Sequence, residues 1–446
     1  MATRAEATEA QTVQFPPLWN STTRVGFRFC FVYFGLYCFS TQIFVSLIPA
    51  PNVDIPDPAT LWPVRPVILW FAPHVLRIKT PLVYSGSGSG DKTFDYVLAL
   101  FLLMVASAAT AIWSALDRRK NHRRESYVTL HKWFHLFIRF ALAGQLLTYG
   151  MTKAFPIQMP ATPLFRLVEP FGNFSKMAVL WTAIGASRGY EIFAGCAELL
   201  GGVLLILPRT STLGALVSLA DMVQVFMLNM SYDVPVKLLS FHLILLSLFL
   251  LAPEFQRLAN FFVLNRTAGP STQTDLFPAW RANRVALMAQ LAFGAVLLVS
   301  NAYEYGNKWA TSDGDARPKS ALYGIWDVDQ MTIDGQVRSP LVTDYDRWRR
   351  VIFDYPKQIW FQRMDGSFAA YGAAIDVGNK SIAIAKRSDP NWKGTLHFEQ
   401  AGSEQLALDG EMDGHRMRMD LKLVDPQKMQ LRSRGFHWVQ EYPFNR

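Results

Sequence analysis

The chain has 446 residues, half of them hydrophobic, and a formal net charge of +9. Basic and acidic residues balance over residues 311–446, so the whole positive excess lies in residues 1–310, beside the long apolar runs. This pattern is typical of membrane proteins and speaks against nucleic-acid binding, and three cysteines without a Cys-x-x-Cys pair exclude a disulfide framework.

Seven apolar runs are long enough to cross a bilayer, which takes about 20 helical residues. They lie near residues 25–48, 94–115, 128–154, 188–207, 210–230, 235–252 and 284–303. The polar stretch before the first run and the length of that run argue against a cleaved signal peptide. We therefore expect a cytoplasmic tail over residues 1–24 and a helical membrane domain over residues 25–305.

The segment Asp117-Arg-Arg-Lys-Asn-His-Arg-Arg124 sets the predicted orientation. Basic residues in a short loop keep that loop on the cytoplasmic side of a membrane. An odd number of spans then carries the chain beyond residue 304 to the opposite side. We predict a multi-pass protein of the cell membrane with an extracytoplasmic C-terminal domain.

Two long loops separate the first spans on the outer side. Residues 61–77 have the aromatic and basic mix of an interfacial segment. Residues 155–187 are rich in Pro, Phe and Trp. We expect this second loop to lie on the membrane surface or to cover the helical bundle.

The C-terminal part has a different composition. Residues 306–320 are rich in Gly, Asp, Ser and Pro and predict a linker, followed by a domain over residues 321–446. Asp-Gly pairs between segments of alternating polarity are a strong β-hairpin signal. They occur at 334–335, 365–366, 409–410 and 413–414. We expect an all-β, antiparallel barrel or sandwich attached to an α-helical membrane bundle.

Four polar residues lie near the middle of four successive spans. They are Arg139, Glu198, Asp221 and His242. Each charge at that depth costs roughly 2.5–3.5 kcal/mol on insertion scales, so we expect these side chains to face one another, with Arg139 paired to Glu198 or Asp221. Such a layer serves either as a structural ion network or as a proton relay or quinone site.

A second polar group lies at the outer ends of three spans. Lys153, Glu191 and Lys237 are expected to form a salt-bridged, structural rim. The long stem of Lys237 lets its ammonium group reach the membrane surface. His242 stands about 140° away around the same helix and is expected to join the buried layer instead.

His131 and His135 are four residues apart, on one helix face with Arg139. This spacing suits a pair of metal ligands or one haem ligand. A pair of histidines in an aromatic helix start near the cytoplasmic interface is more typical of contacts with lipid head groups or water. We therefore predict no metal site.

Spans three to five resemble the DoxX family of membrane proteins, over residues 130–250. The residues that carry this resemblance are Arg139, Gly144, Tyr149-Gly150, Lys153, Glu198-Leu-Leu-Gly-Gly202 and Arg209. The resemblance implies a link to membrane redox chemistry, in which thiol or thiosulfate oxidation feeds quinone. The lone Cys196 gives no support to a thiol relay in this chain.

Tyr323-Gly-Ile-Trp326 at the start of the C-terminal domain is similar to the first strand of lipocalin-like barrels. The resemblance implies that Trp326 plugs one end of the barrel and that an arginine of the last strand packs on it. Arg432 or Arg434 would fill that role. Such a barrel either holds an apolar ligand or is filled by its own side chains.

These features give two functional hypotheses. In the first, the chain is a redox-linked subunit of a membrane oxidoreductase whose polar layer handles protons or a quinone. Membrane lipid surrounds it, and the redox centre is on a partner protein. In the second, it is a non-enzymatic, membrane-anchored binding or assembly protein whose barrel recognises a lipid or a protein. The two hypotheses differ in whether the chain takes part in catalysis.

Overall fold

The computed structural model describes residues 19–119, 127–273, 275–314, 316–386 and 388–445. Its first unit, the helical unit, combines the chain up to Met151 with Gly195–Glu304. The second, the barrel unit, combines Thr152–Ala194 with the chain from Tyr305 onward. Most of the predicted cytoplasmic tail and of the basic loop that predicts the orientation lies outside the described residues.

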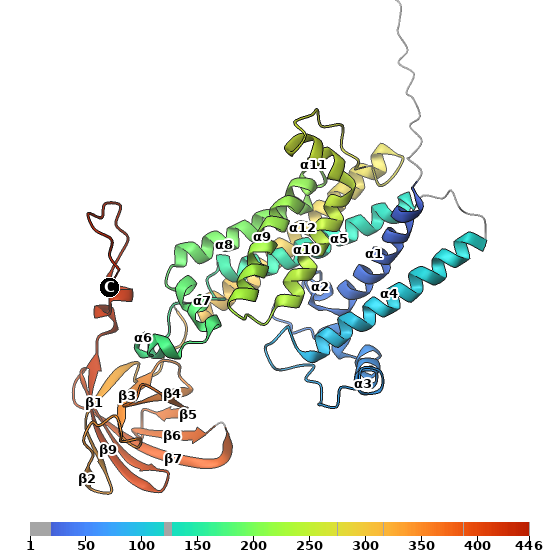
Figure 1. Ribbon diagram of the computed structural model, residues 1–446. Coiled ribbons are helices and arrows are strands. Elements are labelled where there is room, and N and C mark those ends of the chain that lie inside the picture. The colour runs from blue at the N-terminus through green and yellow to red at the C-terminus, as the bar shows by residue number, and fades with distance from the viewer. Residues whose placement is uncertain (1–18, 120–126, 274, 315, 387, 446) are drawn as a thin grey trace, which may run out of the picture. The chain divides into compact units, whose positions relative to one another are not determined.

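Helices stand at all seven places where the apolar runs predict them (Figure 1). They are α1 (Ser21–Ser40), α4 (Thr93–Arg119), α5 (Val128–Ala154), α8 (Arg188–Ile206), α9 (Ser211–Ser231), α10 (Lys237–Leu251) and α12 (Trp280–Lys308). Among the described residues, five stretches are long and apolar enough to cross a membrane. They are Thr93–Arg119, Arg188–Ile206, Pro208–Ser231, Lys237–Phe262 and Trp280–Asp313. The chain is thus a membrane protein, and α1 and α5 are helices outside this set of five.

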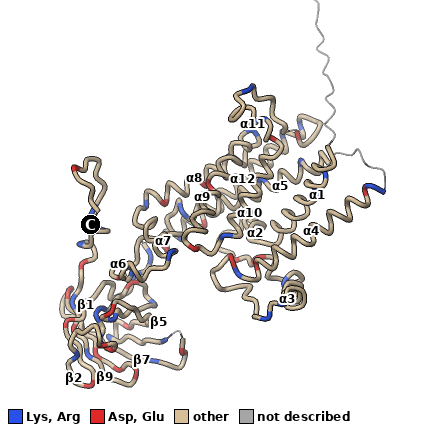
Figure 2. The backbone as a smooth tube through the Cα atoms, in the orientation of Figure 1, with Lys and Arg blue, Asp and Glu red and all other residues tan. Residues whose placement is uncertain are grey.

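Shorter helices fill the connections. They are α2 (Gln42–Val45), η1 (Pro58–Thr60), α3 (Val64–His74), α6 (Leu164–Val168), η2 (Phe171–Asn173), α7 (Lys176–Gly185), η3 (Pro208–Thr210), η4 (Ala252–Glu254), α11 (Phe255–Phe262), η6 (Pro426–Lys428) and α13 (Gln430–Ser433). The π-helical η5 (Trp309–Asp313) follows α12 directly, so residues 306–313 of the predicted linker are helical. Figure 2 shows how few charges lie along α4 between its two ends, as expected for a helix in lipid.

Small residues let the helices of the first unit approach closely. A Cβ atom on Gly150 of α5 would stand 2.8 Å from Leu199 Cγ and 3.0 Å from the Gly195 carbonyl oxygen, both on α8. A Cβ atom on Gly202 would stand 3.3 Å from the Ala143 carbonyl oxygen. Small residues at such contacts are how membrane helices gain van der Waals packing without help from water. Gly150 and Gly202 therefore have a packing role in this bundle.

The first prediction concerns this contact between α5 and α8. Gly150→Ala should lower the free energy of unfolding by about 1–3 kcal/mol, because the new methyl group overpacks a backbone contact. Gly26→Ala is the control, since nothing lies within 4 Å of a Cβ atom there; removing a helix glycine should stabilise by roughly 0.5–1 kcal/mol. Thermal unfolding in detergent measures both variants, and equal effects would contradict close packing at Gly150.

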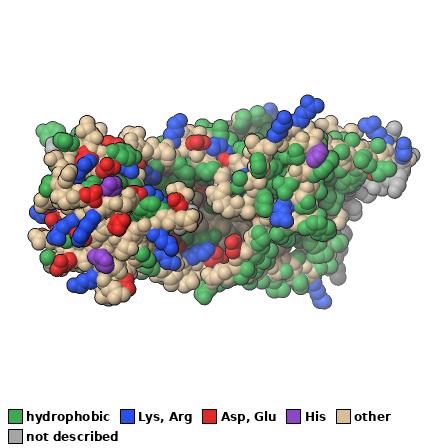
Figure 3. Space-filling model, turned by 90° about the horizontal axis from the view of Figure 1, so that it is seen from below, with side chains coloured by type: hydrophobic (Ala, Val, Ile, Leu, Met, Phe, Trp, Pro, Cys, Tyr) green, Lys and Arg blue, Asp and Glu red, His purple; other side chains and the backbone are tan. Residues whose placement is uncertain are grey.

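The C-terminal strands form a closed antiparallel barrel of eight strands, with β2 added as a short hairpin arm on β1. The strands are β1 (Gly324–Ile333), β2 (Gln336–Val337), β3 (Trp348–Phe353), β4 (Gln358–Arg363), β5 (Phe368–Asp376), β6 (Ser381–Lys386), β7 (Asp389–Gln400), β8 (Gln405–Met412) and β9 (His415–Val424). Pairing of β1 with β9 closes the barrel. Figure 3 shows charged side chains spread over the surface of the barrel unit, whereas hydrophobic side chains dominate the visible surface of the helical unit.

Two Asp-Gly turns form hairpins of the barrel unit as predicted. Asp334-Gly335 and Asp413-Gly414 have positive φ at both residues, as a two-residue hairpin turn requires. The prediction of a turn at 409–410 was wrong, because Asp409 and Gly410 lie inside β8. There the glycine has another role, since a Cβ atom on Gly410 would meet the Thr395 carbonyl oxygen of β7 at 2.2 Å.

The barrel interior is filled by its own apolar side chains, among them Trp326, Phe353 and Phe361. Trp326 is 2% exposed and donates from Nε1 to the Leu322 carbonyl at 3.0 Å. The prediction that Arg432 or Arg434 lies on the last strand and packs on Trp326 was wrong. Arg432 lies in α13 and donates to the Thr162 carbonyl at 2.8 Å, and Arg434 stands over the ring of Phe444.

Part of the long loop 155–187 packs on the barrel, whereas we expected this loop to lie on the membrane surface or to cover the helical bundle. The carboxylate of Asp354, which is 0% exposed, accepts a hydrogen bond from the backbone N–H of Leu164 at 2.8 Å. The same carboxylate forms an ion pair with Arg317. Phe165 stacks on Trp360 with ring centroids 4.3 Å apart. Apolar rings and a buried carboxylate together hold α6 against the barrel.

The second prediction follows from Asp354. Asp354→Ala should cost about 3–5 kcal/mol of stability, because it leaves the Arg317 guanidinium without its buried partner. The backbone N–H of Leu164 should then exchange with solvent much faster, measured by hydrogen exchange. Asp376→Ala is the control, since that carboxylate is exposed and accepts from Asn379 alone among the described side-chain donors. Unchanged protection at Leu164 would contradict this role of Asp354.

Candidate functional site

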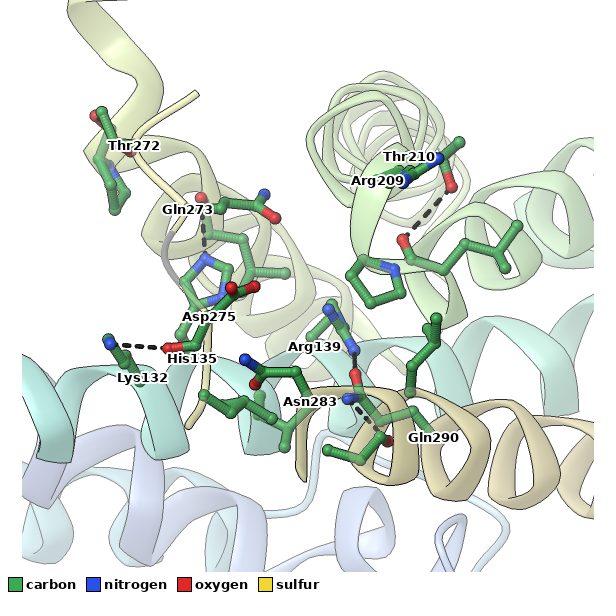
Figure 4. Close-up of a pocket in the computed structure, with 18 of the residues that line it drawn as sticks. Lys132, His135, Arg139, Arg209, Thr210, Thr272, Gln273, Asp275, Asn283 and Gln290 are labelled. Atoms are coloured by element: carbon green, nitrogen blue, oxygen red, sulfur yellow. Dashed lines mark hydrogen bonds between the residues drawn. The ribbon is translucent and has the colours of Figure 1, made fainter. Parts of the chain in front are cut away.

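The helical unit contains a cavity of about 750 Å³. Side chains of α5 and α12 form two of its walls, and the turn between α8 and α9 and the chain after α11 complete it (Figure 4). His131, His135 and Arg139 line it from α5, because residues spaced by four share one helix face. Asn283 and Gln290 line it from α12, seven residues or about two turns apart.

Arg139 lies at the most buried part of this wall. Its side chain is 5% exposed, and its Nη2 donates to Gln290 Oε1. Gln290 is held in turn, since its Nε2 donates to the Ala286 carbonyl at 3.0 Å. The Nε–H group of Arg139 is buried and has no hydrogen-bond partner within the described part of the chain. The cavity is therefore lined by a cation with one donor still to be satisfied.

The predicted pairing of Arg139 with Glu198 or Asp221 was wrong. The contacts of Arg139 in the described residues run to Gln290 and to the ring of Phe140, 5.4 Å away. Glu198 is buried elsewhere in the bundle and acts electrostatically on Tyr149 of α5, whose hydroxyl accepts from Gln42 at 3.2 Å. A neutral amide thus replaces the expected carboxylate at the arginine.

His242 belongs to a separate cluster between α1 and α10. Its Nδ1 lies 2.7 Å from the Leu238 carbonyl, which only accepts, so Nδ1 carries the proton. Its Nε2 then accepts from the Tyr33 hydroxyl at 2.8 Å. Tyr37 stacks on the imidazole with centroids 3.6 Å apart. The expected single layer is therefore divided into distinct groups, with Arg139 in one and His242 in another.

The residues of the predicted rim have other partners as well. Lys237 pairs with Asp233 at 2.9 Å and with Asp91 at 3.6 Å. Asp91 also accepts from the first backbone N–H groups of α10, which is the usual role of a carboxylate at a helix N-terminus. Glu191 is 0% exposed, accepts from the Met159 N–H at 2.9 Å and interacts with Lys153.

The remaining charges around the cavity are mostly basic. Lys132, Arg209 and Arg284 line it together with Glu254 and Asp275. Glu254 is already engaged, since it accepts from Thr272 Oγ1 at 2.6 Å and from Arg257 at 2.8 Å. Leucines at 136, 207, 250, 287 and 291 supply apolar walls. The arrangement suits a ligand with an oxygen acceptor on an apolar body.

Comparison with known proteins shows similarity to a bacterial protein. An uncharacterized protein of Bacillus subtilis (strain 168), YwoB, is 32% identical to this chain over 125 residues, which are 79% of YwoB and 28% of this chain. The chain belongs to the YwoB family. No family model matches this member of the YwoB family, and no solved structure matches it either.

Charge at membrane depth did not point to Asn283 and Gln290, two uncharged polar residues of α12 in this YwoB-family protein. The sequence holds a signal for them, because residues seven positions apart share one face of a helix. Among the described residues, no group of three His, Cys, Asp or Glu side chains is placed to hold a metal ion.

The third prediction tests the partner of Arg139 in this YwoB-family chain. Gln290→Leu should destabilise the protein by about 1.5–3 kcal/mol, because a buried guanidinium loses a hydrogen bond. Gln290→Glu should restore stability by placing a carboxylate beside the same group. Gln256→Leu is the matched control, since that side chain is exposed and its hydrogen bond in the described part of the chain runs to Asn260. Both variants are compared by thermal unfolding. An equal loss of stability in Gln290→Leu and Gln256→Leu would contradict the pairing of Arg139 with Gln290.

Proposed function

We propose that the helical unit binds the head group of a membrane quinone in this cavity. The chain then acts as a redox-linked subunit, and the electron-transfer centre lies on a partner protein. The observation that carries the proposal is Arg139, a cavity-lining cation whose buried Nε–H still lacks an acceptor among the described residues. A quinone carbonyl is such an acceptor.

The other side chains of the wall support this ligand class. Quinones combine two carbonyl oxygens with an apolar ring and an isoprenoid tail. The leucines of the cavity suit the ring, and the polar side chains of Asn283 and Gln290 stand on the facing helix. A volume of about 750 Å³ accommodates a ring with the first part of a tail.

Two histidines of α5 support proton handling at the same place. Reduction of a quinone to the hydroquinone takes two electrons, supplied here by the partner, and two protons. His131 and His135 line the cavity on the face of Arg139, with ring centroids 5.7 Å apart. His135 has one weak described contact, 3.4 Å to the Leu250 carbonyl, which leaves it free to exchange a proton with a ligand.

The resemblance to the DoxX family supports the redox assignment, since Arg139, Gly150, Lys153 and Glu198-Leu-Leu-Gly-Gly202 match the pattern of that family.

We infer seven membrane crossings, counting α1 and α5 with the five apolar stretches. Arg118 and Arg119 at the end of α4 favour the cytoplasmic side for that end and an extracytoplasmic position for the barrel. We also keep the lipocalin-like assignment of the barrel as a proposal, on the strength of Trp326.

A second function is favoured by one feature of the barrel unit. The segment after α13 exposes large aromatic side chains, with Phe436 at 78%, Trp438 at 91% and Tyr442 at 84%. A binding or assembly protein would use such a surface to recognise a lipid or a protein. In that case the chain is not an enzyme subunit, and deletion of the segment alone would abolish its cellular role.

The fourth prediction tests the quinone proposal. Equilibrium dialysis of the purified full chain against short-tailed benzoquinone and naphthoquinone analogues should show saturable binding. Arg139→Leu should weaken it about 10- to 100-fold, since a hydrogen bond from a charged donor contributes roughly 1.5–3 kcal/mol. Leu287→Trp should also weaken it by filling the cavity without touching the donor.

Gln256→Leu serves as the control and should bind like the unchanged chain. A folded Arg139→Leu variant that binds quinone with unaltered affinity would contradict the proposal. So would displacement of the analogue by phosphatidylglycerol and not by other quinones, because the basic wall would then be a phospholipid site.

A further inference from the structure

The short helix α11 has a clean division of polar and apolar residues. It follows α10 after the turn η4 that contains Pro253. At 100° per residue, Phe255, Leu258, Ala259 and Phe262 fall on one face, and Gln256, Arg257 and Asn260 fall on the opposite one. Leu258 packs on the core of the helical unit, while Phe255 and Phe262 remain 70% and 67% exposed. The apolar face is therefore only partly covered by the protein.

An ion pair and hydrogen bonds of Glu254 fix the start of α11. Glu254, which is 1% exposed, accepts from Arg257 in the first turn of the helix and from the backbone N–H of Thr272 at 2.8 Å. The turn at Pro253 ends α10 before α11 begins. The turn η4 thus separates α11 from α10 within the apolar stretch Lys237–Phe262, and two phenylalanines of α11 remain exposed.

The sequence on either side of α11 carries a net positive charge. Between residues 253 and 284 the sequence has Arg257, Arg266, Arg281 and Arg284 against Glu254 and Asp275. Trp280, 62% exposed, adds an aromatic side chain of the kind that is enriched at membrane–water boundaries. Exposed phenylalanines on one face, with arginines nearby, are the features by which amphipathic helices bind at a bilayer surface with anionic lipids.

We propose that α11 is an interfacial helix that inserts Phe255 and Phe262 between the head groups of the bilayer, with the surrounding arginines on anionic lipid phosphates. It anchors the end of the bundle at which Glu254 lines the cavity, and so sets the depth of that cavity wall. The two phenylalanines do not line the cavity, so their insertion does not depend on what the cavity binds. Its occupant is the lipid bilayer itself.

The experiment uses nitroxide spin labels on the full chain in lipid nanodiscs. Cys30→Ser, Cys38→Ala and Cys196→Ser remove the native thiols, which are all free. Labels then replace Phe262 and, as the matched control on the polar face, Gln256. Collision of each label with oxygen, which concentrates in lipid, is compared with collision with a water-soluble nickel chelate.

The label at Phe262 should meet oxygen several-fold more often than the nickel chelate, and the label at Gln256 should show the reverse. Replacing part of the phosphatidylcholine by phosphatidylglycerol should move the Phe262 label deeper.

Two outcomes would overturn the proposal. Equal nickel access at both positions would place α11 in water, and oxygen access alone at both would make α11 part of a membrane span. Phe255 gives a second labelling site if the Phe262 variant is unstable. No quinone is present in the measurement, so the result of the spin-label experiment is independent of the result of the quinone-binding experiment.

Discussion

A guanidinium group buried among apolar helices has to be stabilised by the protein, since hydrocarbon offers it no hydrogen bonds. Arg139 meets this constraint with a neutral amide, Gln290, and not with a carboxylate. Its charge therefore stays uncompensated by any described contact. Its buried Nε–H has no acceptor among the described residues, and Arg139 lines a cavity together with leucines and histidines. A neutral partner fixes the side chain and leaves its field available to a ligand. The proposed site depends on this one arrangement.

Helix α5 connects this constraint to the rest of the bundle. Its first half presents His131, His135 and Arg139 to the cavity, and its second half carries Gly150, which lets α8 approach to backbone contact. Displacement of α8 would widen the bundle around the same helix that positions the arginine. Packing and the geometry of the site are thus properties of one helix, and the glycines and polar residues that resemble the DoxX pattern have separate physical tasks on it.

Much of the fold could be predicted from local patterns. Apolar runs predicted the seven long helices, and Asp334-Gly335 and Asp413-Gly414 predicted hairpins, because span length and turn geometry are set by neighbouring residues. Gly410 shows the limit of such signals, since its place in β8 is decided by the close approach of β7. The docking of α6 through Asp354 depends on residues nearly two hundred positions apart, and no local pattern encodes it.

Only part of the cavity could be predicted from the sequence. Arg139 stood out because charge at membrane depth is costly, but the partner could not be chosen by charge alone. The central claim is that this arginine holds a quinone, and photoaffinity labelling tests it most directly. An azido-quinone activated in membranes that contain the full chain should attach to residues of α5 and α12 around Arg139, and unlabelled quinone should prevent it. Attachment confined to the barrel, or to helix surfaces away from α5 and α12, would contradict the account.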